Sequence, residues 1–403
     1  MDALKKVIVV IGTRPEAIKL APVVLELGKH RAHFNTKICV TGQHREMLDQ
    51  MLRVFGLRPD YDLQIMKAGQ GLGEVTSASL TGLDRILRQD RPDLVLVQGD
   101  TTTTFAAALA AYYHTIPVGH VEAGLRTWKK HDPFPEEINR RLTTQLSDFH
   151  FAPTEVSRNN LLQEGVDPEN ILVTGNTVVD ALLLTRARLS EQPSATIDPL
   201  GPTEGSRVIL VTAHRRESFG LPFRRICEAI RAIAERRRDV LVVYPVHLNP
   251  NVQAPVREIL DGMPNVRLLP PMDYVSFVAC MQRAHILLTD SGGIQEEGPA
   301  LGKPVLVMRE VSERPEAISA GTALLTGTDP DRIVAAVTSL LDDPACYRRM
   351  TSRPNPYGDG HAAERIVQFL LSRIAKLPSS AGCMVERPLQ LLQSDHRGMR
   401  AQS

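Results

Sequence analysis

The sequence predicts an α/β protein built from two similar domains that face each other across a cleft. Short apolar runs rich in β-branched residues alternate with longer amphipathic segments, which is the pattern of a parallel sheet covered by helices. A stretch rich in Pro, Ser, Thr and Gly, residues 190–206, has no sustained apolar period and interrupts this alternation. The chain of 403 residues is also long enough for two domains.

Residues 1–189 contain six apolar runs that we interpret as the strands of a first domain. They lie at 7–11, 37–41, 94–98, 118–121, 149–152 and 171–174. We expect residues 190–206 to be a linker, because their composition is typical of a segment between domains.

Residues 207–376 have the same texture and predict a second domain. Its strands are expected at 208–211, 240–244, 266–269, 286–289 and 305–308. Helix patterns follow at 329–341 and 362–376, and the last helix is expected to pack back on the first domain. Residues 377–403 are polar with little periodicity, so we expect a disordered tail.

The composition excludes several classes of protein. The 47 Lys and Arg residues nearly balance the 46 Asp and Glu residues, so the chain lacks the basic surface that nucleic acid selects. The apolar run at residues 7–11 is too short for a signal peptide or a membrane span. Five widely spaced cysteines indicate reduced thiols. We therefore expect a cytoplasmic protein that binds neither nucleic acid nor membrane.

Polar clusters follow the predicted strands, where ligands bind in open α/β sheets. Residues 12–19 (GTRPEAIK) form a turn of small residues that enters a helix, with Arg14 and Lys19 near its start. A helix N-terminus with two cations suits a phosphate. An ordinary strand-to-helix turn with two surface cations explains these residues equally well.

Three acidic residues lie at the expected carboxyl edge of the first sheet. Asp100 follows the third predicted strand, Glu122 follows the fourth, and Glu136 begins the next helical segment. Helix capping or the helix dipole explains each acid singly, and Asp100 is a natural N-cap. Neither explains the whole set as readily, so the three acids indicate acid–base chemistry.

The second half places basic and small residues at equivalent points. Residues 212–217 (TAHRRE) bring His214 beside two arginines, which indicates an anion, although a solvent-facing loop explains this histidine alone. Residues 291–293 (SGG) open a helix whose backbone N–H groups can approach a phosphate. Glu297, about one turn further on, can accept both hydroxyls of a ribose.

The remaining patterns indicate no cofactor. Residues 69–73 (GQGLG) lack the spacing of a dinucleotide fingerprint, and no apolar strand leads into them, so NAD is not inferred. His44 and His247 have no partners at metal-ligand spacing.

Taken together, six segments resemble the signature set of the non-hydrolysing UDP-N-acetylglucosamine 2-epimerase family. They are residues 12–19, 43–47 (QHREM), 99–103 (GDTTT), 120–126 (HVEAGLR), 214–217 (HRRE) and 290–297 (DSGGIQEE). The resemblance runs from about residue 7 to about residue 374, and includes residues 244–251 (YPVHLNPN) and 355–360 (NPYGDG). It implies two Rossmann-like domains in a GT-B-like arrangement, a homodimer, and no need for a nicotinamide or a metal.

The resemblance also implies site residues. The implied catalytic residues are Asp100, Glu122, Glu136 and His214. The implied substrate pocket adds the residues Arg14, Lys19, Met272, Phe277, Ser291, Gly292, Gly293, Glu297 and Arg314. A second site, through which substrate activates the enzyme, would comprise Gln43, Gln70, Arg215 and His247. Met272 departs from the family pattern, in which a glutamine is expected at the position that faces uracil, so selectivity for uracil depends on whether that side chain reads the base.

The implied activity is the reversible C2 epimerisation of UDP-GlcNAc to UDP-ManNAc, a precursor for cell-surface polysaccharide. UDP leaves as the C1–O bond breaks, a base takes the C2 proton, and 2-acetamidoglucal forms. Re-addition of UDP with protonation of the opposite face inverts C2. This scheme needs cations on the diphosphate and carboxyl groups that exchange protons, and the clusters supply both.

Four other functions fit parts of the sequence. They are a hydrolysing epimerase, a related 2-epimerase acting on a modified UDP-sugar, a GT-B glycosyltransferase and a UDP-sugar sensor without activity. The motif set favours the non-hydrolysing epimerase over the hydrolysing one, and no apolar membrane-facing patch supports the glycosyltransferase. Clustered carboxylates argue against the sensor, because they do not help to bind a diphosphate.

Overall fold

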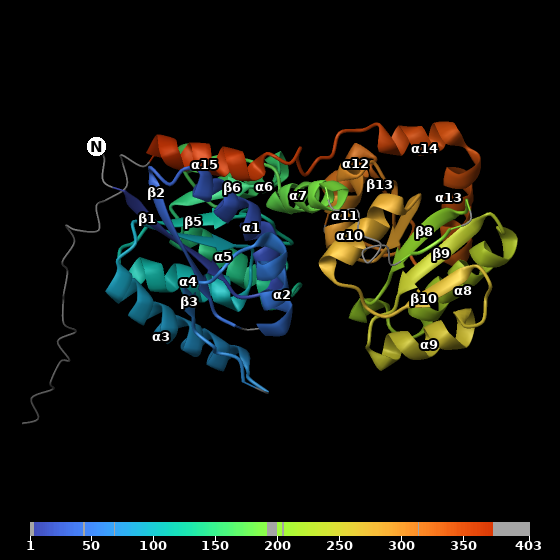
Figure 1. Ribbon diagram of the computed structural model, residues 1–403, viewed down its shortest axis with the longest axis horizontal. Helices are drawn as coiled ribbons and strands as arrows, with labels where there is room; N and C mark the ends of the chain where they lie inside the picture. The colour runs from blue at the N-terminus through green and yellow to red at the C-terminus, as the bar shows by residue number, and fades with distance from the viewer. Residues whose placement is uncertain are drawn as a thin grey trace, which may run out of the picture.

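A computed structural model describes residues 4–42, 45–67, 69–191, 200–203, 205–312 and 314–373 of the chain. It contains two parallel β-sheets, each with its own helices, and Figure 1 shows them as two bodies side by side. The predicted α/β class with two facing Rossmann-like domains is therefore confirmed.

The first sheet has seven strands in the order β3-β2-β1-β4-β5-β6-β7, and every neighbouring pair is parallel. The strands are β1 (Lys5–Ile11), β2 (Phe34–Val40), β3 (Tyr61–Asp62), β4 (Leu94–Gln98), β5 (Val118–Val121), β6 (Phe149–Ala152) and β7 (Ile171–Val173). The strand order reverses between β1 and β4, which is where a ligand crevice is expected.

The second sheet has six strands in the order β10-β9-β8-β11-β12-β13, again all parallel. The strands are β8 (Arg207–Thr212), β9 (Val240–Pro245), β10 (Val266–Leu269), β11 (Ile286–Thr289), β12 (Val305–Val307) and β13 (Ala323–Leu325). The equivalent switch point lies between β8 and β11.

Helices connect the strands. Those of the first domain are α1 (Arg14–Lys29), α2 (Arg45–Phe55), α3 (Leu72–Asp90), α4 (Thr102–Tyr113), α5 (Glu136–Leu146), α6 (Glu155–Gln163) and α7 (Thr177–Glu191). The second-domain helices are α8 (Leu221–Arg236), α9 (Pro250–Leu260), α10 (Tyr274–Arg283), α11 (Gly292–Ala300), α12 (Pro315–Ala320), α13 (Pro330–Asp342) and α14 (Pro344–Thr351). The final helix is α15 (Ala362–Arg373).

The sequence did not predict β3 and β13, because strands of two and three residues are too short to show a period. The predicted strand at 37–41 is also displaced, since β2 begins at Phe34 and ends at Val40. The expected tail at 377–403 and most of the expected linker, residues 192–199 and 204, lie outside the described residues.

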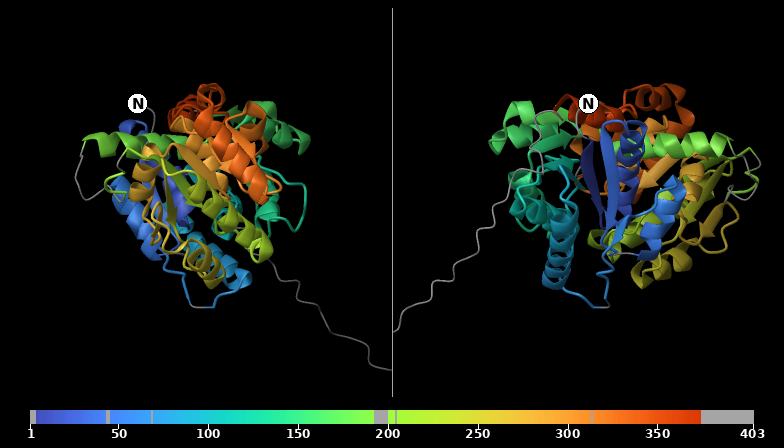
Figure 2. Two further views of the ribbon diagram at one scale, coloured as in Figure 1. Left: turned by 90° about the vertical axis from the view of Figure 1, so that its right-hand side faces the viewer. Right: turned by 60° about the vertical axis from the view of Figure 1, so that its left-hand side comes forward.

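The helix α15 crosses back from the second domain to the first. It lies beside α1 and α7, in red at the top of Figures 1 and 2. Phe369 packs edge-on against Phe149 and Phe151, and Asp180 accepts a hydrogen bond of 2.8 Å from the backbone N–H of Ala363. The chain therefore joins the two domains at α7 and again through α15.

In the described part of the chain, every helix is too short or too polar to cross a membrane.

Candidate active site between the two domains

The turns after β1 and β4 are tied together by the buried carboxylate of Glu16. It accepts hydrogen bonds from the backbone N–H groups of Gly12 (3.0 Å) and Thr13 (2.6 Å). It also accepts the hydroxyls of Thr101 (2.9 Å) and Thr104 (3.0 Å). The first cation-bearing turn and the Asp100 turn are therefore held in one rigid unit.

The sequence interpretation of Asp100 as an N-cap is wrong. The cap of α4 is Thr101, whose hydroxyl accepts the backbone N–H of Thr104 at 3.1 Å. The carboxylate of Asp100 does not cap the helix. It pairs instead with Arg140, whose Nε and Nη2 both lie 2.8 Å from Oδ2 of Asp100. Asp100 is thus held as an ion-paired carboxylate at the carboxyl edge of the sheet.

Glu122 is the most strongly held of the predicted acids. Its backbone has φ 62°, in the left-handed region, and its side chain is buried. The carboxylate accepts hydrogen bonds from Lys19 (2.5 Å), from Asn176 (2.9 Å) and from the amide of Gln98. Burial opposes ionisation of Glu122, but the charges of Lys19 and Arg314 outweigh it, so the pKa of Glu122 is lowered.

Glu136 and its neighbour occupy different environments at the start of α5. Glu136 is half-buried, whereas Glu137 is completely buried. Glu137 accepts the backbone N–H groups of Thr127 (3.0 Å) and Trp128 (3.1 Å). Glu136 is therefore the acid of this pair that remains available to a ligand.

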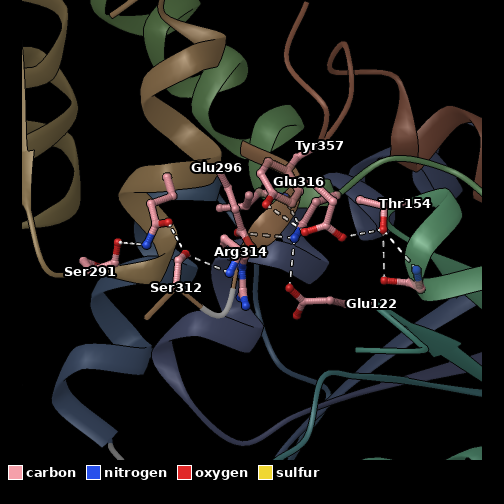
Figure 3. Close-up of polar contacts among 12 residues, drawn as sticks. Glu122, Thr154, Ser291, Glu296, Ser312, Arg314, Glu316 and Tyr357 are labelled. Carbon is pink, nitrogen blue, oxygen red and sulfur yellow. Dashed lines mark hydrogen bonds and ion pairs between the residues drawn. The ribbon is translucent and has the colours of Figure 1, made fainter. Parts of the chain in front are cut away.

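The two domains meet through a chain of polar contacts at Asn176. The amide of Asn176 donates to Glu122 at 2.9 Å and to Glu296 of α11 at 3.3 Å. Glu296 in turn accepts a hydrogen bond from the guanidinium of Arg314. In Figure 3 the guanidinium of Arg314 lies against Glu296, and Glu122, Tyr357 and Glu316 lie close by. Arg314, predicted at the phosphates, therefore faces the acids of the first domain.

The predicted phosphate loop opens helix α11. Ser291 is its N-cap, and Gly292 and Gly293 are its first two residues. A Cβ at Gly292 would lie 3.8 Å from Nη2 of Arg215 and 4.0 Å from the guanidinium carbon of Arg314. Two cations and a helix N-terminus therefore converge on the glycines, which is the chemistry of an anion site.

His214 lies beside this loop. It is held by Asp290, which directly precedes Ser291 in the sequence. Asp290 is buried and accepts the backbone N–H groups of His214 (2.6 Å) and Arg215 (2.7 Å). The imidazole of His214 stacks on that of His247, with the ring centroids 5.4 Å apart. Burial and the nearby positive groups lower the pKa of His214 despite the charge of Asp290. The neutral imidazole can therefore accept a proton.

Glu297 lies deeper in α11 and is buried. Burial, with the charge of Glu296, raises the pKa of Glu297 to about 8. Its Oε1 lies 3.4 Å from the hydroxyl of Tyr274, and the charges of Lys19 and Arg14 act on it from the first domain. The predicted ribose acceptor is thus a protonated carboxyl at neutral pH until a ligand supplies donors.

Phe277 lies on α10, and Met272 lies just before this helix. Both side chains are partly buried against the core, and the thiol of Cys280 lies 3.5 Å from the sulfur of Met272. The departure at position 272 therefore places a thioether where an amide was expected, with no hydrogen-bonding group for a base edge.

The expected second site is only partly assembled. Arg215 and His247 lie beside His214, whereas Gln70 lies on the loop before α3, where its side-chain oxygen accepts the backbone N–H of Lys67 at 2.8 Å. Gln43 lies outside the described residues.

Sequence analysis missed three residues of the site: Asn176, Glu296 and Arg140. Asn176 follows β7, so the rule that singled out residues after predicted strands would have found it. Glu296 was overlooked because the adjacent Glu297 was chosen as the ligand residue. Which of two neighbouring residues on a helix faces the site depends on how the helix packs, and the sequence does not show this. Arg140 carries no signal in the sequence, because its partner Asp100 is 40 residues away.

A cavity of about 660 Å³ adjoins the site and is lined by both domains, with Arg140 on one side and Arg314 on the other. Among the described residues, no group of three His, Cys, Asp or Glu side chains lies close enough together to hold a metal ion. The arrangement can bind an anion on the second domain and present carboxylates to it from the first.

Two Rossmann-like domains whose polar strand ends meet in this way define the GT-B-like class of proteins. Comparison with known proteins makes the assignment specific. A family profile described as UDP-N-acetylglucosamine 2-epimerase matches residues 25–371. The chain belongs to this family, which confirms the resemblance.

Individual relatives agree with the assignment. The UDP-N-acetylglucosamine 2-epimerase of Yersinia pestis is 56% identical over 374 residues, which cover 91% of this chain and 98% of the relative. A crystal structure of the Neisseria meningitidis UDP-GlcNAc 2-epimerase bound to UDP-GlcNAc is 50% identical, with a TM-score of 0.85, and the match covers 91% of this chain and all of the other. The Methanocaldococcus jannaschii enzyme, in complex with UDP-GlcNAc and UDP, is 34% identical with a TM-score of 0.75, covering 91% of this chain and 99% of the other.

Proposed function

We propose that the protein catalyses the reversible C2 epimerisation of UDP-GlcNAc to UDP-ManNAc. The observation that carries the proposal is the contact of Asn176 with Glu122 of one domain and Glu296 of the other, because it places a cluster of acids against an anion site. Membership of the family and the UDP-GlcNAc complexes of two relatives support the choice of substrate.

The second domain binds UDP in this proposal. Backbone N–H groups of residues 291–293, with Arg14 and Arg314, neutralise the diphosphate, and Glu297 takes the ribose hydroxyls. When UDP binds, the guanidinium of Arg314 must therefore either leave Glu296 for the phosphate or contact both groups at once. Stabilising the departing UDP is what allows the C1–O bond to break.

The first domain supplies the proton chemistry. Asp100, Glu122 and Glu136 lie near the sugar, where they remove the C2 proton, stabilise the positive charge that develops at C1, and return a proton to the opposite face. His214, neutral at working pH, lies on the UDP side and can take up a proton as the diphosphate leaves. Closure of the two domains keeps water from the glycal intermediate.

Family membership also leads us to propose a homodimer in the cytoplasm, and a pathway to cell-surface polysaccharide for its product. Light scattering of the purified chain tests the first: a mass of twice 44.5 kDa is expected, and a single-chain mass contradicts it.

Proton NMR in deuterated water tests the function directly. Incubation with UDP-GlcNAc alone is expected to produce UDP-ManNAc with deuterium at C2. Asp100→Asn should lose at least about 100-fold in turnover while keeping its affinity for UDP within a few fold. Release of free sugar would instead indicate a hydrolysing enzyme. Bound nucleotide with no change in the sugar signals would contradict the proposal and indicate another UDP-sugar or a glycosyltransferase.

A further inference from the structure

Asp100 is held by only one of its two carboxylate oxygens. Nε and Nη2 of Arg140 both lie 2.8 Å from Oδ2, and the amide of Asn139 donates to the backbone carbonyl of Asp100 at 2.9 Å. Within the described residues Oδ1 makes no hydrogen bond of its own. Two donors on one oxygen hold that oxygen in place and leave the other oxygen for a ligand.

Arg140 is itself fixed by Glu137, one turn earlier on α5. Nη1 of Arg140 lies 3.3 Å from Oε2 of Glu137, which is fully buried. The same carboxylate accepts the backbone N–H groups of Thr127 and Trp128, so it also anchors the segment that follows Glu122. One buried ion-paired group therefore connects the Asp100 turn, the segment after Glu122 and the helix that begins with Glu136.

We propose that Arg140, anchored by Glu137, is a positioning residue for the epimerisation: it holds Oδ2 of Asp100 so that Oδ1 is presented to the sugar. Arg140 acts through Asp100 and is not itself a catalytic residue. This role rests on the proposed function, because it matters only if Asp100 takes part in the reaction. Of the three acids, Asp100 is the one whose carboxylate accepts two N–H groups of an arginine on one oxygen.

The geometry distinguishes this role from a purely structural ion pair. A structural pair needs one contact of any kind, whereas two donors here converge on one oxygen of Asp100, and its other oxygen accepts no hydrogen bond from the described residues. Lysine in place of Arg140 keeps the positive charge but lacks the rigid guanidinium with two N–H groups directed at one oxygen, so it holds Oδ2 less firmly. Arg140→Lys therefore tests how the orientation of the Asp100 carboxylate affects the reaction while the positive charge beside it is kept.

The test compares Arg140→Lys with Arg141→Lys, a change of the next residue on the same helix. Arg141 is half exposed and pairs with Glu164 at 3.5 Å, so its replacement is a matched control. Arg140→Lys is expected to lower kcat by about 10- to 100-fold and to change KM by less than about threefold, because a small misplacement of a reacting group slows the chemical step. Arg141→Lys is expected to leave both parameters unchanged.

A double variant gives the second readout. If Arg140 acts through Asp100, adding Arg140→Lys to Asp100→Asn lowers the rate of deuterium incorporation at C2 by less than about threefold further. Affinity for UDP, measured by calorimetry, should be the same in all variants.

Three outcomes overturn the inference. They are an unchanged kcat in Arg140→Lys, a loss of UDP affinity as large as the loss of kcat, and losses that multiply in the double variant. Absence of exchange by the unsubstituted chain would instead refute the proposed function, and the inference with it.

Discussion

Lys19 and Glu122 form an ion pair of 2.5 Å between side chains that are 103 residues apart in the sequence. The pair is nearly buried, with 15% of the lysine side chain and 5% of the glutamate side chain exposed. Through Asn176, which donates to both Glu122 and Glu296, the pair is connected to helix α11 of the second domain. Burial opposes the charge on Lys19, but Glu122 and Glu296 outweigh it, so the pKa of Lys19 is raised and the group stays cationic.

Removing this lysine should destabilise the protein as well as inactivate it. Lys19→Met leaves Glu122 as a buried charge without its main cation, which we expect to lower the free energy of unfolding by about 3 to 5 kcal/mol. Lys29→Met is the matched control on the same helix, because Lys29 is 70% exposed and pairs with the neighbouring Glu26, so a loss of less than about 1 kcal/mol is expected. Urea denaturation of both variants measures the difference, and equal losses would contradict the prediction.

Of the two neighbouring acids of α5, only Glu137 should contribute measurably to stability. Glu136→Gln is expected to lower kcat by about 100-fold or more without a change in stability, because Glu136 is only half-buried and exchanges a proton with the sugar in the proposed function. Glu137→Gln is expected to lower the free energy of unfolding by about 1 to 3 kcal/mol, because the amide cannot accept from Arg140, Thr127 and Trp128 as the carboxylate does. Kinetics and denaturation of both variants test this, and full activity of Glu136→Gln would remove it from the mechanism.

Binding of UDP should release a proton near neutral pH. The carboxyl of Glu297, with a pKa of about 8 because of burial and Glu296, is mostly protonated in the free protein at pH 7. Ribose hydroxyls that donate to both oxygens favour the ionised form, so binding lowers this pKa and the proton is released. Calorimetry in buffers of different ionisation enthalpy measures the release.

Glu297→Gln is the control for that experiment, since it cannot titrate. It should bind UDP more weakly and without proton release. Proton uptake by the unsubstituted protein, or release that persists in the variant, would show that another group titrates.

The anchor of α15 should make stability depend on pH. Burial raises the pKa of Asp180 to about 6, although the backbone N–H groups that it accepts at the start of α15 and the nearby His361 oppose this shift. In the unfolded chain the carboxyl ionises near its ordinary value, so the folded form holds the proton more tightly. Stability from this group is complete below about pH 4 and is lost as the pH rises through about 6, by up to about 3 kcal/mol.

Asp180→Asn tests the anchor directly. The variant keeps an oxygen that accepts the N–H of Ala363, and its free energy of unfolding should vary less between pH 4 and 6. Asp359→Asn is the control, because pairing with Arg365 lowers the pKa of Asp359 to about 2, outside this range. Equal pH profiles for Asp180→Asn and the unsubstituted protein would contradict the prediction.

Much of the fold was predictable because most strands coincide with short apolar runs in the sequence. The strands β4, β5, β6 and β11 begin and end where their apolar runs do. The strands β3 and β13 were missed, because two or three residues carry no period and pair only once a neighbouring strand is in place. The cap of α4 was misassigned to Asp100 for a similar reason: Asp and Thr are both good caps, and the ion pair with Arg140 decides between them.

The sequence by itself determined the α/β class, the family, and the residue types of the site, because strand periodicity and the order of motifs are local properties of a chain. The tertiary structure decided which of those residues touch. It joined Asn176 to both Glu122 and Glu296, gave Asp100 its arginine, and buried Glu297 beside Glu296. These pairings depend on the distance between side chains and on the exclusion of water around them, and both arise only when the two sheets have packed.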